Sequence, residues 1–268
     1  MFSDKEFHAW AKSGKAVMFA AVMTKIDGRK DDDLLGKYGF RGFPSLAVLD
    51  ADGGALIKGL DRSMSAITNT VEIAPTYAAM KAKVDAGEKV DEAKWYMMRM
   101  RVGQMELDEA KEGLKKNELS PEDCAFAESQ ILGMEFLDKL RASRGQPGEE
   151  INAFVYAAFQ KGTKLPKGSQ FQSYFDRFLL QVATEKEDVK AFFAALPGAK
   201  KAIQDDAKSA AERIPQMEAD LEKYKDNERL VPRIEAAIER AKQMVEDSKK
   251  ELAELEATAK KMKAKMKK

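Results

Sequence analysis

The sequence contains one thiol and one imidazole, Cys124 and His8, and these side chain types are common nucleophiles and bases near neutral pH. Cys124 lies at a predicted helix start after Ser120, where the helix dipole would favour a thiolate. Glu122 and Asp123 lie beside it, and their charges oppose this. A reactive thiol and a small buried side chain are both open interpretations of Cys124. We predict no catalytic residue in this chain.

Metal chemistry has little support in the sequence. A single histidine and a single cysteine cannot supply a usual zinc ligand set. Residues 29–34, RKDDDL, contain three aspartates but lack the alternating ligand spacing and the glycine of a calcium loop. We interpret them as a solvated helix start, and we predict no metal site and no cofactor.

The elements around residues 38–50, YGFRGFPSLAVLD, predict an α/β layer at the start of the chain. A short helix is expected over residues 3–14, and the compact apolar run 16–26 is typical of a strand buried on both faces. Residues 31–40 predict a helical turn, and residues 45–50 predict a second strand. An Asp-Gly turn then leads to a hairpin partner at 55–60. A helical crossover would join the two buried strands in parallel.

This region resembles the thioredoxin family. LLGKYGFRGFPSLAVLDADGGALIKGL, residues 34–60, is similar to the carboxy-terminal half of the thioredoxin fold, with its Gly-Phe-Pro loop, strand, Asp-Gly turn and strand. Residues 2–27 resemble the helix and strand that follow the redox motif in a bacterial branch of the family. The similarity covers residues 2–72, roughly a quarter of the chain.

The resemblance implies a binding loop formed by Gly42, Phe43, Pro44 and Ser45, with a cis peptide bond before the proline. In the family, the backbone at the position of Phe43 pairs with an extended substrate or partner. A trans proline that opens an edge strand, with Phe43 covering the core, is the alternative interpretation.

The Cys-x-x-Cys pair of the resembling family would come before residue 2, and this chain contains neither that pair nor the strand before it. One cysteine cannot replace the attacking and resolving thiols. We expect the strands at 16–26 and 45–49 to pair directly, or the sheet to keep open edges that could bind another chain. The function predicted is therefore a non-catalytic thioredoxin-like binding or scaffold protein. The alternative is a thiol-disulfide oxidoreductase whose Cys-x-x-Cys lies upstream of this chain.

From about residue 75 onward the patterns predict helices. Two short helices are split at Gly103-Gln104, and the spacing of Tyr96, Gly103 and Ala110 indicates a packed helical hairpin. Ser120 is expected to cap the next helix. The methionine-rich stretch 95–105 is interpreted as packed core, although a peptide-binding groove is also conceivable.

Residues 203–224 and 234–266 carry apolar side chains in alternating steps of four and three, which predicts a coiled-coil-like antiparallel pair of helices. Pro215 should kink or restart the first helix, and the second helix should then extend beyond it. Its far end must then project, fray or find another partner, and pairing with another copy of the chain would give a homo-oligomer. The predicted fold is thus α/β then all-α: a partial thioredoxin-like fold over 1–75, a helical domain over 76–200 and a helical hairpin over 201–268.

Composition limits the classes of partner. The 268 residues contain 46 Lys and Arg against 45 Asp and Glu, which gives no charge argument for nucleic acid. The lysine-rich end, residues 260–268, is interpreted as a solubilising helix end. The uncharged runs, such as residues 16–24, are too short to span a bilayer. The amino terminus lacks the pattern of a secretory signal, and the localisation stays unassigned although members of the resembling family are often periplasmic or secreted. A protein or peptide partner is expected at the proline loop or at an open sheet edge.

Overall fold

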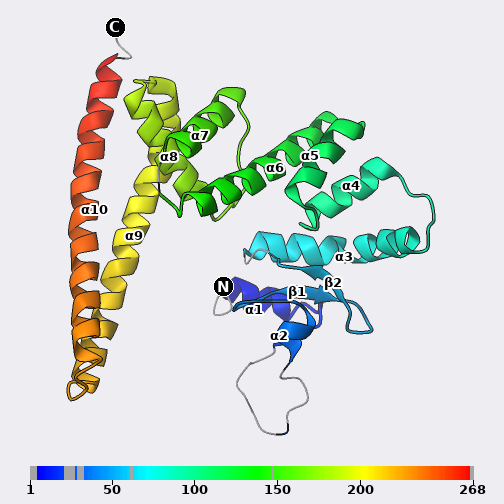
Figure 1. Cartoon of the computed structure of the whole chain (residues 1–268), viewed down its shortest axis with the longest axis horizontal. Coiled ribbons are helices and arrows are strands. Elements are labelled where there is room, and N and C mark those ends of the chain that lie inside the picture. The colour runs from blue at the N-terminus through cyan, green and yellow to red at the C-terminus, as the bar shows by residue number, and fades with distance from the viewer. Residues whose placement is uncertain (1–4, 21–27, 29–32, 61–62, 147, 266–268) are drawn as a thin grey trace. The chain divides into compact units, whose positions relative to one another are not determined.

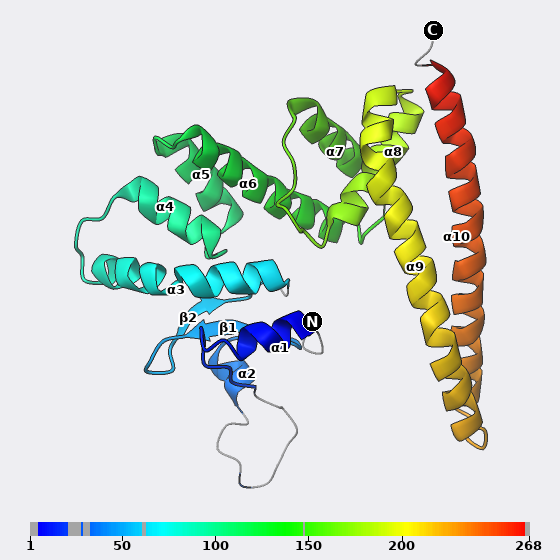
Figure 2. The same ribbon diagram turned by 180° about the vertical axis from the view of Figure 1, so that it is seen from behind.

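The computed structural model describes residues 5–20, 28, 33–60, 63–146 and 148–265, and this part of the chain is mostly helical with a small two-stranded antiparallel sheet (Figure 1). Figure 2 shows the same elements from behind. The elements in chain order are α1 Lys5–Ala11, α2 Leu34–Lys37, β1 Ala47–Leu49, β2 Ala55–Lys58, α3 Met64–Asp85, α4 Glu92–Arg101, α5 Leu107–Lys116, α6 Pro121–Ala142, α7 Glu149–Lys161, α8 Gln172–Glu185, α9 Val189–Lys223 and α10 Val231–Lys265.

The chain divides into two compact units, a first unit of Met1–Ile131 and a second unit of Leu132–Lys268. The division falls inside α6, and each unit is described by itself. The sequence-based division at residues 75 and 200 stays a prediction.

The β-hairpin expected at residues 45–60 is present. β1 and β2 pair antiparallel, with Val48 opposite Ile57. The turn is closed by the Asp50 carboxylate, which accepts hydrogen bonds from the backbone N–H groups of Asp52 and Gly54 at 3.0 and 2.7 Å. A side chain at Gly54 would meet this carboxylate, which explains the glycine there.

The buried strand predicted at residues 16–26 is wrong in its described part. Residues 17–20 form no strand, and the side chains of Val17 and Phe19 are 100% and 69% exposed. Residues 21–27 lie outside the described part of the chain. An apolar run predicts a buried strand only where other elements cover it, and residues 17–20 lack such cover among the described residues. The expected parallel pairing with β1 is not seen there either.

The core of the first unit joins the hairpin to the helices that follow. Ile57 of β2 is completely buried and clusters with Tyr77 of α3 and with Val102, which follows α4. The Gln104 side chain donates a hydrogen bond to the backbone carbonyl of Lys58 at 2.9 Å. Residues far apart in the sequence therefore hold the sheet against α3 and α4.

α4 and α5 form the helical hairpin that the spacing of aromatic and small residues predicts. The two helices are separated at Gly103, which has a positive φ of 68°. The Tyr96 hydroxyl of α4 donates to the backbone carbonyl of Ala110 in α5 at 2.8 Å, and burial raises the pKa of Tyr96. Met97 and Met100 are buried. This burial favours the packed-core interpretation of the methionine-rich stretch over a groove.

The predicted start of α6 is confirmed. The Ser120 Oγ accepts a hydrogen bond from the backbone N–H of Asp123 at 3.2 Å and donates to the Asp123 carboxylate at 2.9 Å. Pro121 occupies the first helical position, where its missing N–H costs no hydrogen bond.

The second unit packs around aromatic side chains of α6, α8 and α9. Phe136 is completely buried, and its ring centroid lies 5.3 Å from that of Phe175. Asp188 caps the start of α9, and its carboxylate accepts from the backbone N–H of Ala191 at 3.0 Å and from the Tyr156 hydroxyl of α7 at 2.8 Å. The start of α9 is therefore tied to α7.

α9 and α10 form the expected antiparallel pair (Figure 1), but the expected overhang of α10 is wrong. Each helix has 35 residues, because α9 begins at Val189 and continues through Pro197 and Pro215 without a break. The end of α10 reaches the start of α9, where Lys265 pairs with Glu187 at 2.6 Å.

Packing along the whole pair explains why the prolines do not end α9. Ala210 of α9 and Ile238, Leu255 and Met262 of α10 are buried in the seam that the heptad pattern predicts. This continuous contact offsets the hydrogen bonds that the two prolines remove. The overhang of α10, which was the reason for the homo-oligomer hypothesis, is therefore absent from the described residues.

Candidate functional site

The loop Gly42–Ser45 lies directly before β1 and contains the binding residues expected from the sequence. The Ser45 hydroxyl donates a hydrogen bond back to the carbonyl of Gly42 at 2.6 Å. The Phe43–Pro44 peptide bond is cis, in agreement with the expectation. The structure thus brings the four residues together in one closed turn.

Two contacts hold the segments that flank this loop. Upstream, the Tyr38 hydroxyl, just after α2, donates to the carbonyl of Gly53 in the hairpin turn at 2.9 Å. Downstream, the Leu46 carbonyl accepts from the backbone N–H of Gly59 at 3.1 Å. The loop is therefore carried on the β-hairpin and is not an isolated extension.

Phe43 points an apolar ring away from the core. Its side chain is 64% exposed, which disagrees with the interpretation that it covers the core. Exposed large apolar side chains also occur elsewhere in the described part of the first unit, at Val17, Met18, Phe19 and Leu49. Single exposed apolar residues are ordinary, and a contiguous patch of them marks an interaction surface.

The loop has the chemistry of a binding surface. Its four residues include no acid, base or thiol, and the Ser45 hydroxyl is engaged within the turn. Backbone polar groups and an aromatic ring are what the loop can offer to another molecule. An extended segment could form hydrogen bonds with the backbone polar groups and pack against the aromatic ring.

The other candidate residues lie away from this loop in the sequence and in different elements. Cys124 is half-buried in the first turn of α6, and its N–H donates to the Ser120 carbonyl at 2.8 Å. His8 is exposed on α1. Asp31 and Asp32 lie outside the described residues, and Asp33 immediately precedes α2. Across the described ranges, no group of three or more His, Cys, Asp or Glu side chains could hold a metal ion.

The protein is mostly helical, and its small β-hairpin carries a loop with an exposed aromatic residue. Comparison with models of protein families, with curated proteins and with solved structures gave no match. The thioredoxin resemblance therefore stays a hypothesis based on residues 2–72. Within the described part of the chain, none of the helices combines the length and apolar character required to cross a membrane.

Two surface features were not predicted from the sequence. The exposure of Val17 and Phe19 was missed because an uninterrupted apolar run is the usual signal of burial. A groove in the second unit is lined by residues from three helices and a loop, among them Arg144, Tyr174 and Glu251. No local pattern predicts such a groove, because its lining residues come from separate segments between positions 144 and 251.

Proposed function

We propose that this protein is a non-catalytic thioredoxin-like binding or scaffold protein. Its binding loop would be Gly42–Ser45, and its helical part would act as an assembly arm. The observation that carries the proposal is the 64% exposure of Phe43 in a closed turn supported by the β-hairpin. The partner would be a protein or peptide with an extended segment.

Ordering a binding surface costs conformational entropy, and the loop reduces this cost. An aromatic side chain buries a large area on binding and loses few rotatable bonds, so aromatic residues often dominate the energy of an interface. The hydrogen bonds at Tyr38, Ser45 and Leu46 fix the segments around Phe43 before any partner arrives. A preorganised loop loses less conformational entropy on association than a flexible one.

The helical arm is the α9–α10 hairpin. Ion pairs connect its two helices along their length, including Lys200 with Glu256 at 2.7 Å and Lys242 with Glu218 at 3.3 Å. A homo-oligomer through these helices would have to use their outer faces, because the apolar seam between them is occupied. Sedimentation equilibrium of the full chain measures this directly, and a mass that stays monomeric at high concentration would remove assembly from the proposal.

The experiment for the binding loop is site-specific photo-crosslinking. A photoreactive phenylalanine analogue replaces Phe43 in the full chain, and a matched variant carries it at Glu88, an exposed position between α3 and α4. We expect the analogue at position 43 to give a discrete crosslinked species between this protein and its partner. The analogue at position 88 should not give this species. Equal crosslinking at both positions, or none at 43, would contradict the proposal.

The alternative function is a thiol-disulfide oxidoreductase whose Cys-x-x-Cys lies upstream. The resemblance favours it, because it implies that a loop like Gly42–Ser45 lies against a cysteine pair. An insulin reduction assay of this chain tests whether it has any turnover without that cysteine pair. We expect no turnover from the chain or from Cys124→Ser, and turnover in both would refute the non-catalytic interpretation.

A further inference from the structure

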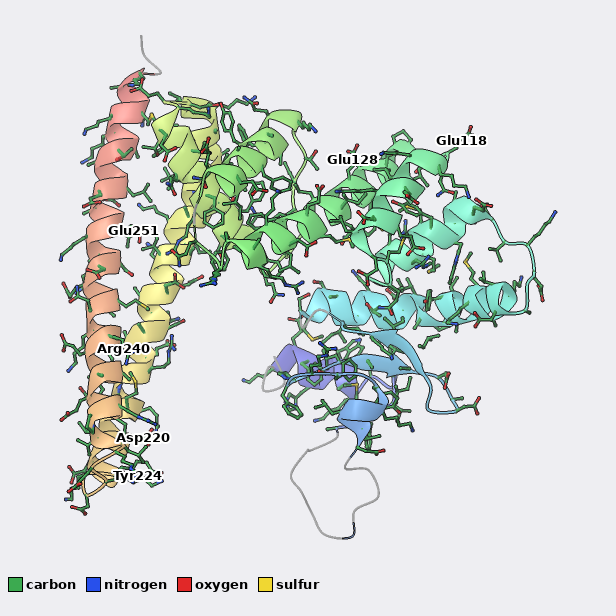
Figure 3. All side chains as sticks on the ribbon, in the orientation of Figure 1. Glu118, Glu128, Asp220, Tyr224, Arg240 and Glu251 are labelled. Carbon is green, nitrogen blue, oxygen red and sulfur yellow. The ribbon has the colours of Figure 1, made fainter. Side chains whose placement is uncertain are left out.

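A groove of about 760 Å³ lies in the second unit, apart in sequence from the binding loop. One face of α8 contributes Tyr174, Phe178 and Gln181, whereas α9 contributes Ile203 and α10 contributes Glu251. Figure 3 labels Glu251 on α10. This volume falls within the range of pockets that hold small molecules.

The floor of the groove is apolar and aromatic. Phe178 and Ile203 are buried at 4% and 1% exposure, which makes them rigid parts of the core. Tyr174 is 42% exposed, and its ring centroid lies 6.4 Å from that of Phe178. A flat or branched apolar group of a ligand could pack against the exposed Tyr174 ring and displace water from it.

Arg144 lines the same groove from the loop after α6 and provides a cation. Its backbone has a φ of 54°, in the left-handed region that few residues other than glycine adopt. Backbone hydrogen bonds fix this conformation, from Arg144 N–H to the Arg141 carbonyl at 3.1 Å and from Gly145 N–H to the Leu140 carbonyl at 2.8 Å. The guanidinium is thus attached to a defined turn.

The charges around the groove favour a ligand with a single negative charge. Arg177 already pairs with Asp206 at 3.0 Å, whereas Arg144 makes no ion pair with any residue that the structure describes. An arginine guanidinium can bind a carboxylate through two parallel hydrogen bonds. Glu185 and Glu251 also line the groove, and their charges would oppose a polyanion.

We propose that this groove binds a monocarboxylate that carries an aromatic or branched apolar group. The carboxylate pairs with Arg144, and the apolar group packs on the exposed ring of Tyr174, which the buried Phe178 and Ile203 support. A free aromatic acid and the carboxy-terminal residue of a peptide share this chemistry. The proposal does not depend on the binding loop of the first unit.

The test is a calorimetric titration of the full chain with N-acetyl-L-phenylalanine and with its uncharged amide. We expect the acid to bind more tightly than the amide. The difference should be at most about fivefold, the upper end for an exposed ion pair. A tripeptide with a free carboxy-terminal phenylalanine is a third probe. Tighter binding of the tripeptide than of the single residue indicates a peptide terminus as the ligand, and the reverse order indicates a free acid.

Three variants connect the binding to the groove. Arg144→Asn removes the charge and introduces a residue that tolerates the left-handed conformation. It should weaken binding of the acid about as much as conversion of the acid to the amide does. Glu251→Gln removes an opposing charge and should tighten binding of the acid but not of the amide. Arg141→Gln, an exposed position outside the groove, should change neither.

The proposal is overturned if neither N-acetyl-L-phenylalanine nor the tripeptide binds, or if the acid and the amide bind equally. It is also overturned if Arg144→Asn and Arg141→Gln change the affinity for the acid by the same amount. Circular dichroism of each variant checks that the helical fold is retained. Because the expected effects of Arg144→Asn and Glu251→Gln have opposite signs, a general loss of structure cannot imitate the predicted result.

Discussion

The replacement Gly113→Ala tests the close packing of α4 against α5. Tyr96 is buried at 4% exposure, and a Cβ atom at Gly113 would overlap the Cδ2 and Cε2 atoms of its ring. In most helix interiors, alanine is more stable than glycine by about 1 kcal/mol. Overpacking a core typically costs about 1–3 kcal/mol. We therefore expect Gly113→Ala to destabilise the protein by up to about 2 kcal/mol, the difference between these two effects.

Two matched backgrounds separate the overlap from the helix propensity. Tyr96→Leu removes the ring, so Gly113→Ala should then stabilise by about 1 kcal/mol. Tyr96→Phe keeps the ring and loses only the hydrogen bond to Ala110, so Gly113→Ala should stay destabilising. Urea unfolding followed by circular dichroism, with hydrogen exchange of α4 and α5, measures each effect. Equal stabilisation by Gly113→Ala in all three backgrounds would refute the close packing.

Two further predictions concern carboxylates of the second unit. Hydrogen bonds from the Ala191 N–H and the Tyr156 hydroxyl lower the pKa of Asp188 in the folded protein. The charged carboxylate therefore stabilises the fold at pH values above the unfolded-state pKa of about 4. This stabilisation is lost as the pH falls through the lower pKa of the folded state. Asp188→Ala should destabilise by about 1 kcal/mol at pH 7, the usual cost of a lost helix cap, and a loss that did not shrink in acid would contradict this. Burial raises the pKa of Asp176, so its charged form costs stability at neutral pH and this cost disappears as the carboxyl is protonated. Asp176→Asn should therefore raise the urea midpoint at pH 7 and have less effect at pH 4, whereas destabilisation at pH 7 would show that the charge is compensated.

Local chemistry allowed much of the helical fold to be predicted. Ser120 marks the start of α6 because its hydroxyl satisfies a free backbone N–H group. Gly103 marks the break between α4 and α5 because it adopts a positive φ. The Asp50 turn marks the β-hairpin for a similar local reason, since its carboxylate accepts from nearby backbone N–H groups.

The failures have a common cause in long-range packing. Pro215 predicted an interruption of α9 from its local effect on the backbone, whereas α10 packs along the whole helix and keeps it continuous. The exposure of Val17 and Phe19 depends on which elements cover them, and their own types do not determine that. For the binding loop, the resemblance places Gly42–Ser45 together, whereas the exposure of Phe43 is seen only in the folded structure.

The most direct test of the account is the affinity of the full chain for the partner captured by crosslinking at residue 43. If Phe43 is the anchor, Phe43→Ala should weaken binding about tenfold or more, as truncation of a central aromatic residue usually does. Its thermal midpoint should not change, because the side chain is 64% exposed. Tyr224→Ala, at the far end of the α9–α10 hairpin (Figure 3), is the matched aromatic control. An affinity that is unchanged by Phe43→Ala, or equally weakened by both replacements, would contradict a binding loop at Gly42–Ser45.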